Sequence, residues 1–394
     1  MKKTKRPLNT WAFLGIYLAI LAVFAGMYAL TKAIYTPVPI AGTGSYTPGT
    51  YTGVGAGRNG DITVEVTVNE NTIQAIQIVR HDETPGISDG AIADIPAAIV
   101  ATQSLGVDSV SGATVSSEGI VAAVADAIAK AGGDVDALKN VAIAAGEHSS
   151  KELTADVVVV GGGGAGMTAA VRLAEQGKHV ILFEKASFLG GAISVSGGNQ
   201  VIMGSKLQAE NGVTDDSVES MVADFQANGA DKNNEEILTL FAENVGSATD
   251  WLVEHCGVGF AEGLHQLGEY THNRELAYTG GGAGFAETMR KAVADSGAEV
   301  YLSTKVESLI TDDNGAVVGV KAVSTDGNTD YTVSAANVIL ATGGYGNNKE
   351  MLTDEMKSAL YYGPATSTGE GIQMAQAVGA QTANMEYGKR YPNG

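Results

Sequence analysis

The sequence predicts an α/β protein in three parts: an N-terminal transmembrane helix, a small α+β domain and a larger domain with a parallel sheet. Residues 11–30 carry no charge, and residues 61–79 alternate apolar and polar side chains as a pair of strands does. Residues 155–184 follow the order strand, glycines, helix, strand, which is typical of a parallel α/β domain. With 44% hydrophobic and 17% charged residues, the 394-residue chain can bury a core.

Composition excludes several classes of function. The chain has 24 Lys and Arg against 44 Asp and Glu, a net charge of −20, which argues against nucleic acid as a partner. Its one cysteine, Cys256, excludes a disulfide framework, a Cys-rich metal or iron–sulfur site and a Cys-x-x-Cys-His haem attachment. Redox chemistry would therefore need an organic cofactor. Cys256 follows His255, but adjacent side chains rarely aim at each other, so we interpret Cys256 as structural.

The N-terminal segment is typical of a membrane anchor. About 20 uncharged residues are enough to span a bilayer as a helix, and Lys2, Lys3, Lys5 and Arg6 precede them. The positive-inside rule then places the N-terminus in the cytoplasm and the soluble domains on the extracytoplasmic side of the cell membrane. The alternative is a cleaved signal peptide, whose apolar region is normally shorter. We assign residues 1–35 to the basic end and single-pass anchor and residues 36–45 to a spacer.

The small domain is predicted at 46–131. It has strands at 61–68 and 72–79, a Pro-Gly turn at 81–86, and helices near 91–103 and 116–130. The Ser-Ser-Glu sequence at 116–118 suits a capped helix start. Taken alone, Ser111-Gly-Ala-Thr114 predicts only a loop that ends in a helix cap.

The order of these segments changes that interpretation. The Gly-rich stretch 51–57, the two strands, Glu83-Thr-Pro-Gly86 and Asp108-x-x-Ser-Gly-Ala-Thr114 together resemble the FMN-binding domains of the sodium-pumping quinone reductase and related electron-transfer proteins. The resemblance implies FMN held covalently through a phosphoester on Thr114, with Ser111, Gly112 and Ala113 beside it, and a separate flavin transferase as a partner. A helix N-terminus there would stabilise the phosphate.

The larger domain is predicted at 154–394, after a linker at 132–153. A strand at 155–160 leads into a Gly-x-Gly-x-x-Gly sequence at Gly161, Gly163 and Gly166, then a helix at 167–176 and a strand at 179–183 that ends at Glu184. In this order the glycines admit a pyrophosphate at the helix start, and Glu184 accepts from ribose hydroxyls. The pattern predicts a Rossmann-like dinucleotide site and leaves FAD and NAD open.

Further segments favour FAD. Residues 184–200, 302–306, 337–345 and 366–375 resemble, in order, cofactor-binding segments of the fumarate reductase/succinate dehydrogenase flavoprotein family, with Glu370 where Asp is usual. The resemblance implies FAD bound without a covalent link. The residues it implies for this cofactor are Gly161, Gly163, Gly164, Ala165, Gly166, Glu184, Lys185, Gly190, Gly191, Ala192, Ser196, Gly197, Gly198, Val306, Ala341, Thr342, Gly343 and Gly344.

The same resemblance bears on the C-terminal end. In that family a capping domain with the proton-donating Arg, and then a returning glycine-rich segment, follow the region matched by 366–375. This sequence ends at Gly394, so we expect a part of a longer protein, inactive alone, with the capping domain and the proton-donor Arg absent; the alternative is a chain completed by a partner. Tyr391, before Pro392, matches a substrate-binding His of fumarate reductases, and Tyr there is closer to urocanate reductases; a surface Tyr fits equally well.

These features predict an extracytoplasmic, membrane-anchored oxidoreductase. It would pass electrons from FMN to FAD and on to the C=C bond of a small α,β-unsaturated carboxylate of the fumarate or urocanate type. The donor would be quinone-linked or a flavoprotein in the membrane. The alternatives are a flavin-carrying electron-transfer module without its own substrate, and an FAD-dependent dehydrogenase of the same fold.

The remaining polar features receive plainer interpretations, and none predicts a metal site. His265, His272 and the glycine run 280–284 are expected to be loop structure, and 313–315 a hairpin turn. The acidic pairs 215–216, 235–236 and 312–313 are expected on solvated helix or turn faces.

Overall fold

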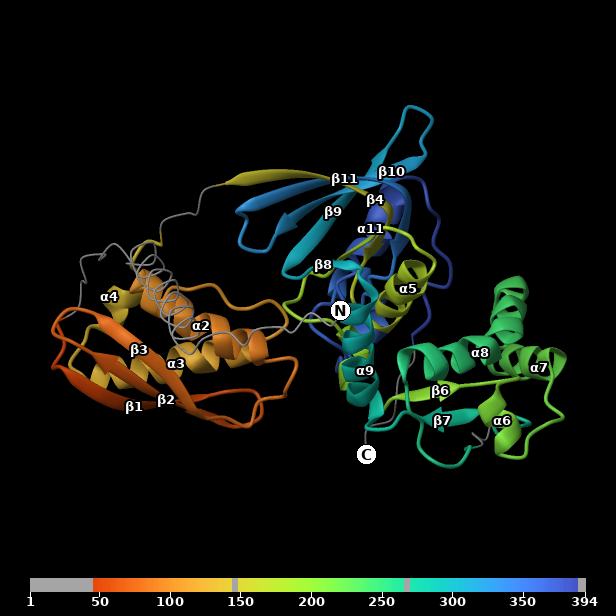
Figure 1. Cartoon of the computed structure of the whole chain (residues 1–394), viewed down its shortest axis with the longest axis horizontal. Coiled ribbons are helices and arrows are strands. Elements are labelled where there is room, and N and C mark those ends of the chain that lie inside the picture. The colour runs from red at the N-terminus through yellow and green to blue at the C-terminus, as the bar shows by residue number, and fades with distance from the viewer. Residues whose placement is uncertain (1–44, 144–147, 266–269, 389–394) are drawn as a thin grey trace, which may run out of the picture.

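The computed structural model describes residues 45–143, 148–265 and 270–388 (Figure 1). No helix within those ranges is long and apolar enough to cross a membrane, and the predicted anchor at 11–30 lies outside them. Tyr391 also lies outside the described residues.

The N-terminal domain is a three-stranded antiparallel sheet covered by helices on one face (Figure 1). The strands are β1 (Gly49–Ala56), β2 (Asp61–Val68) and β3 (Ile73–Arg80), and the helices are α2 (Asp89–Thr102), α3 (Thr114–Lys130) and the short α4 (Val135–Lys139). The two predicted strands and two predicted helices are confirmed to within two residues at each end. β1 was not predicted, because its glycines hide the alternating pattern.

Glycines in β1 allow α3 to lie directly on the sheet. A Cβ atom on Gly53 would come within 1.9 Å of the Ala123 carbonyl oxygen, and one on Gly55 within 2.2 Å of the Gly119 carbonyl oxygen. A side chain at either position would therefore push the helix away from the strand. Part of the glycine excess thus serves contact between a helix and a strand.

The capping role predicted for the serines at the start of α3 was wrong. The helix begins at Thr114, so the serines lie inside its first turn and do not cap it. Ser117 Oγ donates to the Ala113 carbonyl oxygen (3.0 Å) and accepts from the Val110 amide (3.0 Å), while Ser116 Oγ donates to the Glu83 carboxylate. The serines fix the loop before the helix, and Thr114 is left at the helix end.

The second domain is built on a six-stranded sheet in the order β8-β5-β4-β11-β10-β9 (Figure 1). The four parallel strands are β8 (Glu299–Tyr301), β5 (Val180–Phe183), β4 (Ser149–Val160) and β11 (Thr329–Leu340); β10 (Val317–Ser324) and β9 (Thr304–Thr311) complete it as an antiparallel edge. β4 begins six residues before the predicted strand, because its first half pairs with β11 from Ser149 onward. The predicted hairpin turn is confirmed, with the Gly315 amide donating to the Asp312 carbonyl (3.0 Å).

Apolar side chains cover both faces of this sheet. Val157 and Val159 of β4 belong to a cluster with α5 (Gly164–Glu175) and α9 (Gly281–Ser296), whereas Val158 and Val160 belong to a second cluster that includes Met374 of α11 (Glu370–Ala377). This two-sided burial explains the continuous apolar run that predicted the strand. The glycine run 280–284, predicted as a loop, instead caps and begins α9.

A third group of elements packs beside this domain. It consists of β6 (Asn199–Val201), β7 (Glu275–Ala277), α6 (Lys206–Glu210), α7 (Val218–Asn228) and α8 (Glu235–Cys256). The short elements η1 (Gly191–Val195), η2 (Lys349–Met351) and α10 (Asp354–Lys357) lie in the connections.

Arg274 corrects one sequence interpretation. This guanidinium is fully buried and binds the carboxylates of Asp216 (2.6 Å) and Asp224 (2.5 Å), so Asp216 is not on a solvated face, although Asp215 is. Cys256 is buried, and burial raises the pKa of its thiol to about 11, in agreement with a structural role.

Candidate functional site

Three parallel strands of the second domain end at the same level. The register pairs Val160 of β4 with Phe183 of β5 and with Leu340 of β11. The residues that follow, Gly161, Glu184 and Ala341, therefore meet at the carboxyl edge of the sheet. Ligands of open α/β sheets bind at this edge.

The glycines of the fingerprint have different structural reasons. Gly161 has a φ of +102°, and a Cβ there would come within 2.4 Å of the Ala341 carbonyl oxygen; a Cβ on Gly166 would come within 1.8 Å of the Gly161 oxygen. A Cβ on Gly163 would meet no atom within 4 Å. Gly163 is the N-cap residue of α5 and provides no side-chain cap. Gly161 and Gly166 therefore allow the backbone to pack closely. Gly163 leaves open space at an uncapped helix N-terminus, where a pyrophosphate fits.

Glu184 is held at the end of β5 by backbone donors. Its Oε2 accepts from the Gly162 amide (2.6 Å) and its Oε1 from the Ala186 amide (2.7 Å), and the side chain is buried. Burial raises the pKa of Glu184 and outweighs these hydrogen bonds. Each carboxylate oxygen keeps lone-pair capacity for a further donor, such as a ribose hydroxyl.

Lys185 links this strand end to α11. Its Nζ lies 3.0 Å from Glu370 Oε2 and 2.9 Å from Thr368 Oγ1. Burial would raise the pKa of Glu370, but the hydrogen bonds from Thr368 and Lys185 hold it below its usual value. The ion pair fixes the start of α11 against the 184–186 segment.

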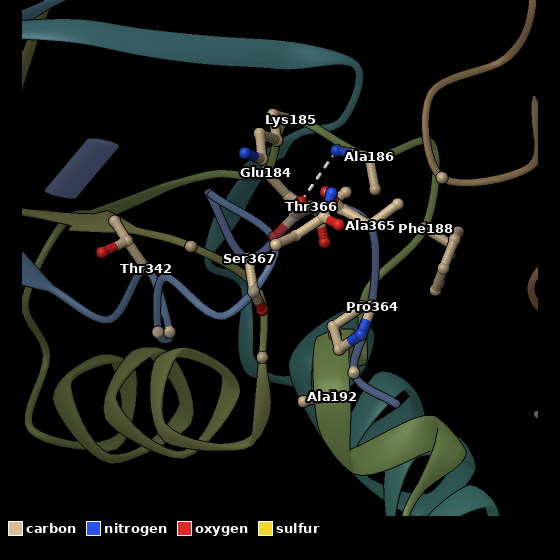
Figure 2. Close-up of a pocket in the computed structure, with 18 of the residues that line it drawn as sticks. Glu184, Lys185, Ala186, Phe188, Ala192, Thr342, Pro364, Ala365, Thr366 and Ser367 are labelled. Carbon is tan, nitrogen blue, oxygen red and sulfur yellow. Dashed lines mark hydrogen bonds between the residues drawn. The ribbon is translucent and has the colours of Figure 1, made fainter. Parts of the chain in front are cut away.

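These elements surround a cavity of about 900 Å³, part of which Figure 2 shows. Both domains line it. The predicted residues on its wall are Gly112, Ala113, Thr114, Gly161, Gly163, Gly164, Ala165, Glu184, Lys185, Gly191, Ala192, Val306, Ala341, Thr342, Gly343 and Gly344. Sequence reasoning thus selected segments from distant parts of the chain that the fold brings together.

Thr114 brings the N-terminal domain to this cavity. It is the first residue of α3 and is exposed, and the N-cap residue Ala113 provides no side-chain cap. The buried carboxylate of Glu83 accepts from Ser116 Oγ and from the Asn59 amide (2.9 Å), which ties the 83–86 turn to the start of α3. The arrangement presents an accessible hydroxyl at a helix end.

Some predicted residues do not line the cavity. Ser111 contacts the second domain, its carbonyl oxygen accepting from the Ser187 amide (3.2 Å). Gly166 and Gly190 support the glycine loop: the Gly190 amide donates to the Gly162 carbonyl (2.8 Å). The segment Ser196, Gly197 and Gly198 lies against the start of α9, where a Cβ on Gly198 would come within 2.1 Å of the Gly282 nitrogen. Whether any predicted residue touches a flavin stays a prediction.

Sequence reasoning missed other residues of the wall. Among them are Arg58, Glu83, Thr84, Phe188, Pro364, Ala365, Thr366 and Ser367. Figure 2 shows Phe188 and the 364–367 loop around the same cavity as Glu184 and Thr342. The sequence 366–375 had been matched to a family segment, so its first residues could have been proposed as site residues; Arg58 gave no signal.

Comparison with known proteins identifies the two domains. The FAD binding domain family matches residues 156–392, and the FMN-binding domain family matches residues 57–129. The chain belongs to the FAD-binding, fumarate reductase-type flavoproteins, with an FMN-binding domain in front. The predicted family, the α/β fold with these two domains, and the two cofactor classes are confirmed.

The flavoprotein chain is similar to reductases of unsaturated acids. It is 34% identical to the urocanate reductase of Eggerthella lenta, over 85% of this chain and 56% of that protein. It is 30% identical to the NADH:acrylate oxidoreductase of Vibrio harveyi, over 86% of this chain and 40% of that protein. The chain spans about half the length of these relatives.

A solved structure shares the fold of the second domain. It is the open conformation of a flavocytochrome c3 fumarate reductase, with a TM-score of 0.54 and 35% identity over 63% of this chain and 43% of that one. The residues of the site fit FAD, because the open space at Gly163, the bare end of α5 and the Glu184 carboxylate match a dinucleotide's phosphates and ribose.

Proposed function

We propose that this chain forms the flavin-binding part of a reductase that acts on the C=C bond of a small α,β-unsaturated carboxylate. The observation that carries the proposal is that one cavity is lined both by Thr114 of the N-terminal domain and by Glu184, Gly163 and Thr342 of the second domain. The urocanate, acrylate and fumarate reductases among its relatives support this substrate class. Bound FMN and FAD would supply stepwise electron transfer and delivery of a hydride to the substrate.

The chain's residues have separate roles in this proposal. The Thr114 hydroxyl would hold FMN through a phosphoester, made by a flavin transferase in an exchange at phosphorus in which the Thr114 oxygen loses its proton and the phosphate loses the group it carried before, and the N-terminus of α3 would stabilise the remaining phosphate charge. The N-terminus of α5 holds the FAD pyrophosphate, and Glu184 accepts from the ribose. Because Thr114 and the residues proposed to hold FAD line one cavity, electrons would need no diffusing carrier between FMN and FAD.

Thr114→Ala tests the attachment. The variant should lose all covalently bound FMN, seen as flavin fluorescence after denaturing electrophoresis, while FAD binding to the full-length protein persists. Ser109→Ala is the matched control, because Ser109 is an exposed residue with a hydroxyl at one of the two unspecified positions of the 108–114 motif. Fluorescence that persists in Thr114→Ala would refute the attachment site.

Substrate addition tests the reaction. Full-length protein carrying both flavins is reduced with dithionite and mixed with fumarate, urocanate or acrylate, and flavin absorbance is followed. A reductase is reoxidised by at least one of these acids, whereas an electron-transfer module without a substrate stays reduced. A dehydrogenase of the same fold would instead be reduced by a saturated substrate.

We also propose that residues 11–30 anchor the protein, with both flavin domains on the extracytoplasmic side and a quinone-linked or flavoprotein donor in the membrane. The support is the uncharged 20-residue segment after four basic residues. Reporter fusions after Gly394 test this orientation. Fused alkaline phosphatase should be active, and a fluorescent protein that folds only in the cytoplasm should show no fluorescence. The reverse pattern would contradict the orientation.

A further inference from the structure

Three glycines of the N-terminal domain lie against the second domain beside the shared cavity. Gly86 of the N-terminal domain lies against the Arg290 guanidinium of α9, where a Cβ would come within 2.9 Å of Nη2. Gly90 lies against Ser187, and Gly112 lies against the ring of Phe188. We call Gly86, Gly90 and Gly112, with Arg290 and the 186–188 segment, the docking face.

The second domain presents its side of the docking face as one unit. Arg290 Nη1 donates to the Leu189 carbonyl oxygen (2.9 Å), which joins α9 to the segment that carries Ser187 and Phe188. Across the contact, the Ser187 amide donates to the Ser111 carbonyl oxygen (3.2 Å). The three glycine contacts and this hydrogen bond lie on one connected surface, so together they fix both the separation and the orientation of the domains.

Gly90 is the most informative of the three glycines. Gly86 (φ +77°) and Gly112 (φ +88°) have backbone conformations that favour glycine in any case. Gly90 lies in the first turn of α2, without a positive φ, where alanine would favour the helix. A Cβ at Gly90 would come within 2.9 Å of Ser187 Oγ and 3.2 Å of Ser187 Cβ. The reason for glycine at this position therefore lies in the other domain.

The docking face is also part of the cavity wall. Gly112, Ala186 and Phe188 line the cavity together with Thr114, which is two residues from Gly112. Any separation of the domains would thus open the cavity between the FMN attachment residue and the FAD site.

We propose that the FMN-binding domain works while docked on the 186–188 segment and Arg290, so that electrons cross between the flavins without movement of this domain. This inference rests on the proposed function. It excludes a cycle in which the FMN-binding domain leaves the second domain between turnovers.

A disulfide across the docking face tests the proposal directly. The 3.2 Å between the Gly90 and Ser187 Cβ positions is close to the ~3.5–4.5 Å of disulfides, so Gly90→Cys with Ser187→Cys should crosslink the domains. Native Cys256 is buried with a raised thiol pKa and competes poorly. The full-length variant is loaded with both flavins while reduced and then oxidised, and disulfide yield is measured by mass spectrometry.

The rate of FMN-to-FAD electron transfer is then measured by stopped-flow absorbance before and after crosslinking. If the domain is already docked, the crosslink changes the rate by less than about twofold. A rate that falls more than tenfold and recovers on reduction of the disulfide would overturn the proposal. Failure of the two cysteines to crosslink would overturn it as well. The two single-cysteine variants serve as controls.

Gly90→Leu tests the same contact by pushing the two domains apart, whereas the disulfide holds them together. The larger side chain cannot fit against Ser187, so the docked population and the transfer rate should fall by about tenfold, with both flavins still bound. Ala97→Leu places the same side chain on the exposed face of α2 and should change nothing. An unchanged rate in Gly90→Leu contradicts the proposal. Absence of any transfer in the unmodified protein would contradict the proposed function instead, and the disulfide yield alone would then decide whether the domains dock.

Discussion

Two helix N-termini, those of α3 and α5, face the same cavity in different ways. Each follows a segment with a glycine at positive φ, Gly112 (+88°) in one case and Gly161 (+102°) in the other, and neither has a side-chain cap. The first residue of α3 is Thr114, with an exposed hydroxyl, whereas α5 begins with Gly164. Both helix ends therefore offer free backbone amides to an anion, but only the end of α3 also carries a hydroxyl group.

The difference indicates that a phosphate group can be held at a helix N-terminus either by a covalent bond or by reversible binding. An uncapped N-terminus forgoes about 1 kcal/mol of capping stabilisation and keeps its amide donors for a phosphate. A hydroxyl at that point allows a covalent bond, which prevents loss of the cofactor. Glycine at that point allows the backbone to approach a pyrophosphate closely, which makes binding reversible and dependent on shape.

The largest expected effect comes from Gly166→Ala, which should disrupt the turn before α5 and leave the N-terminus of α3 unchanged. Its Cβ would overlap the Gly161 carbonyl oxygen at 1.8 Å, so the turn before α5 must move, at a cost of about 3 kcal/mol. Thermal unfolding should show a lower transition for the second domain and loss of FAD, with FMN on Thr114 retained. Lys178→Ala is the control, since Lys178 is exposed and is not among the residues predicted to bind FAD. An unchanged transition in Gly166→Ala would mean that the turn is not packed as described.

A smaller effect is expected from Gly163→Ser, which sharpens the comparison. Serine is a good N-cap residue and a Cβ meets no atom within 4 Å at this position. The free energy of unfolding of the flavin-free protein should therefore be unchanged or slightly higher. The side chain would use the amides and space intended for pyrophosphate, and FAD affinity should fall by about tenfold, as one lost hydrogen-bonded contact implies. Titration of flavin-free protein with FAD measures this. Equal affinity in the two proteins would show that the end of α5 does not hold the phosphates.

The smallest effect is expected from Glu370→Gln. Because the pKa of Glu370 is lower in the folded protein than its usual 4.5, the ionised group stabilises the fold above that pH, and the contribution is lost as pH falls through the lower folded-state value. At pH 7 the variant should lose about 0.5 kcal/mol, as expected for a partly exposed ion pair with Lys185. Chemical denaturation at pH 7 and at acid pH measures the difference, with Glu287→Gln on the exposed face of α9 as control. A loss that persists at acid pH would assign the effect to something other than ionisation.

Much of the fold could be predicted because its signals are local. The alternation in 61–68 and the apolar run 155–160 each specify a strand, and the glycines with Glu184 specify a nucleotide site at its end. The capping role of Ser116 was predicted wrongly, because Ser116 binds Glu83, a residue 33 positions away. Asp216 was predicted as solvated, because nothing near it in the sequence indicates its buried partner Arg274.

By itself the sequence determined the strands at 61–68, 72–79 and 155–160 and the dinucleotide site after Gly161, because periodicity and short spacing act within a single segment, whereas FMN and FAD followed only from the resemblance to known families. Only the tertiary structure decided that Thr114 and Glu184 face one cavity, that Gly53 and Gly55 seat a helix, and that Gly90 faces Ser187. These facts depend on how closely two backbones approach when distant segments pack. A glycine looks the same in the sequence whether it serves a turn, a ligand or another domain.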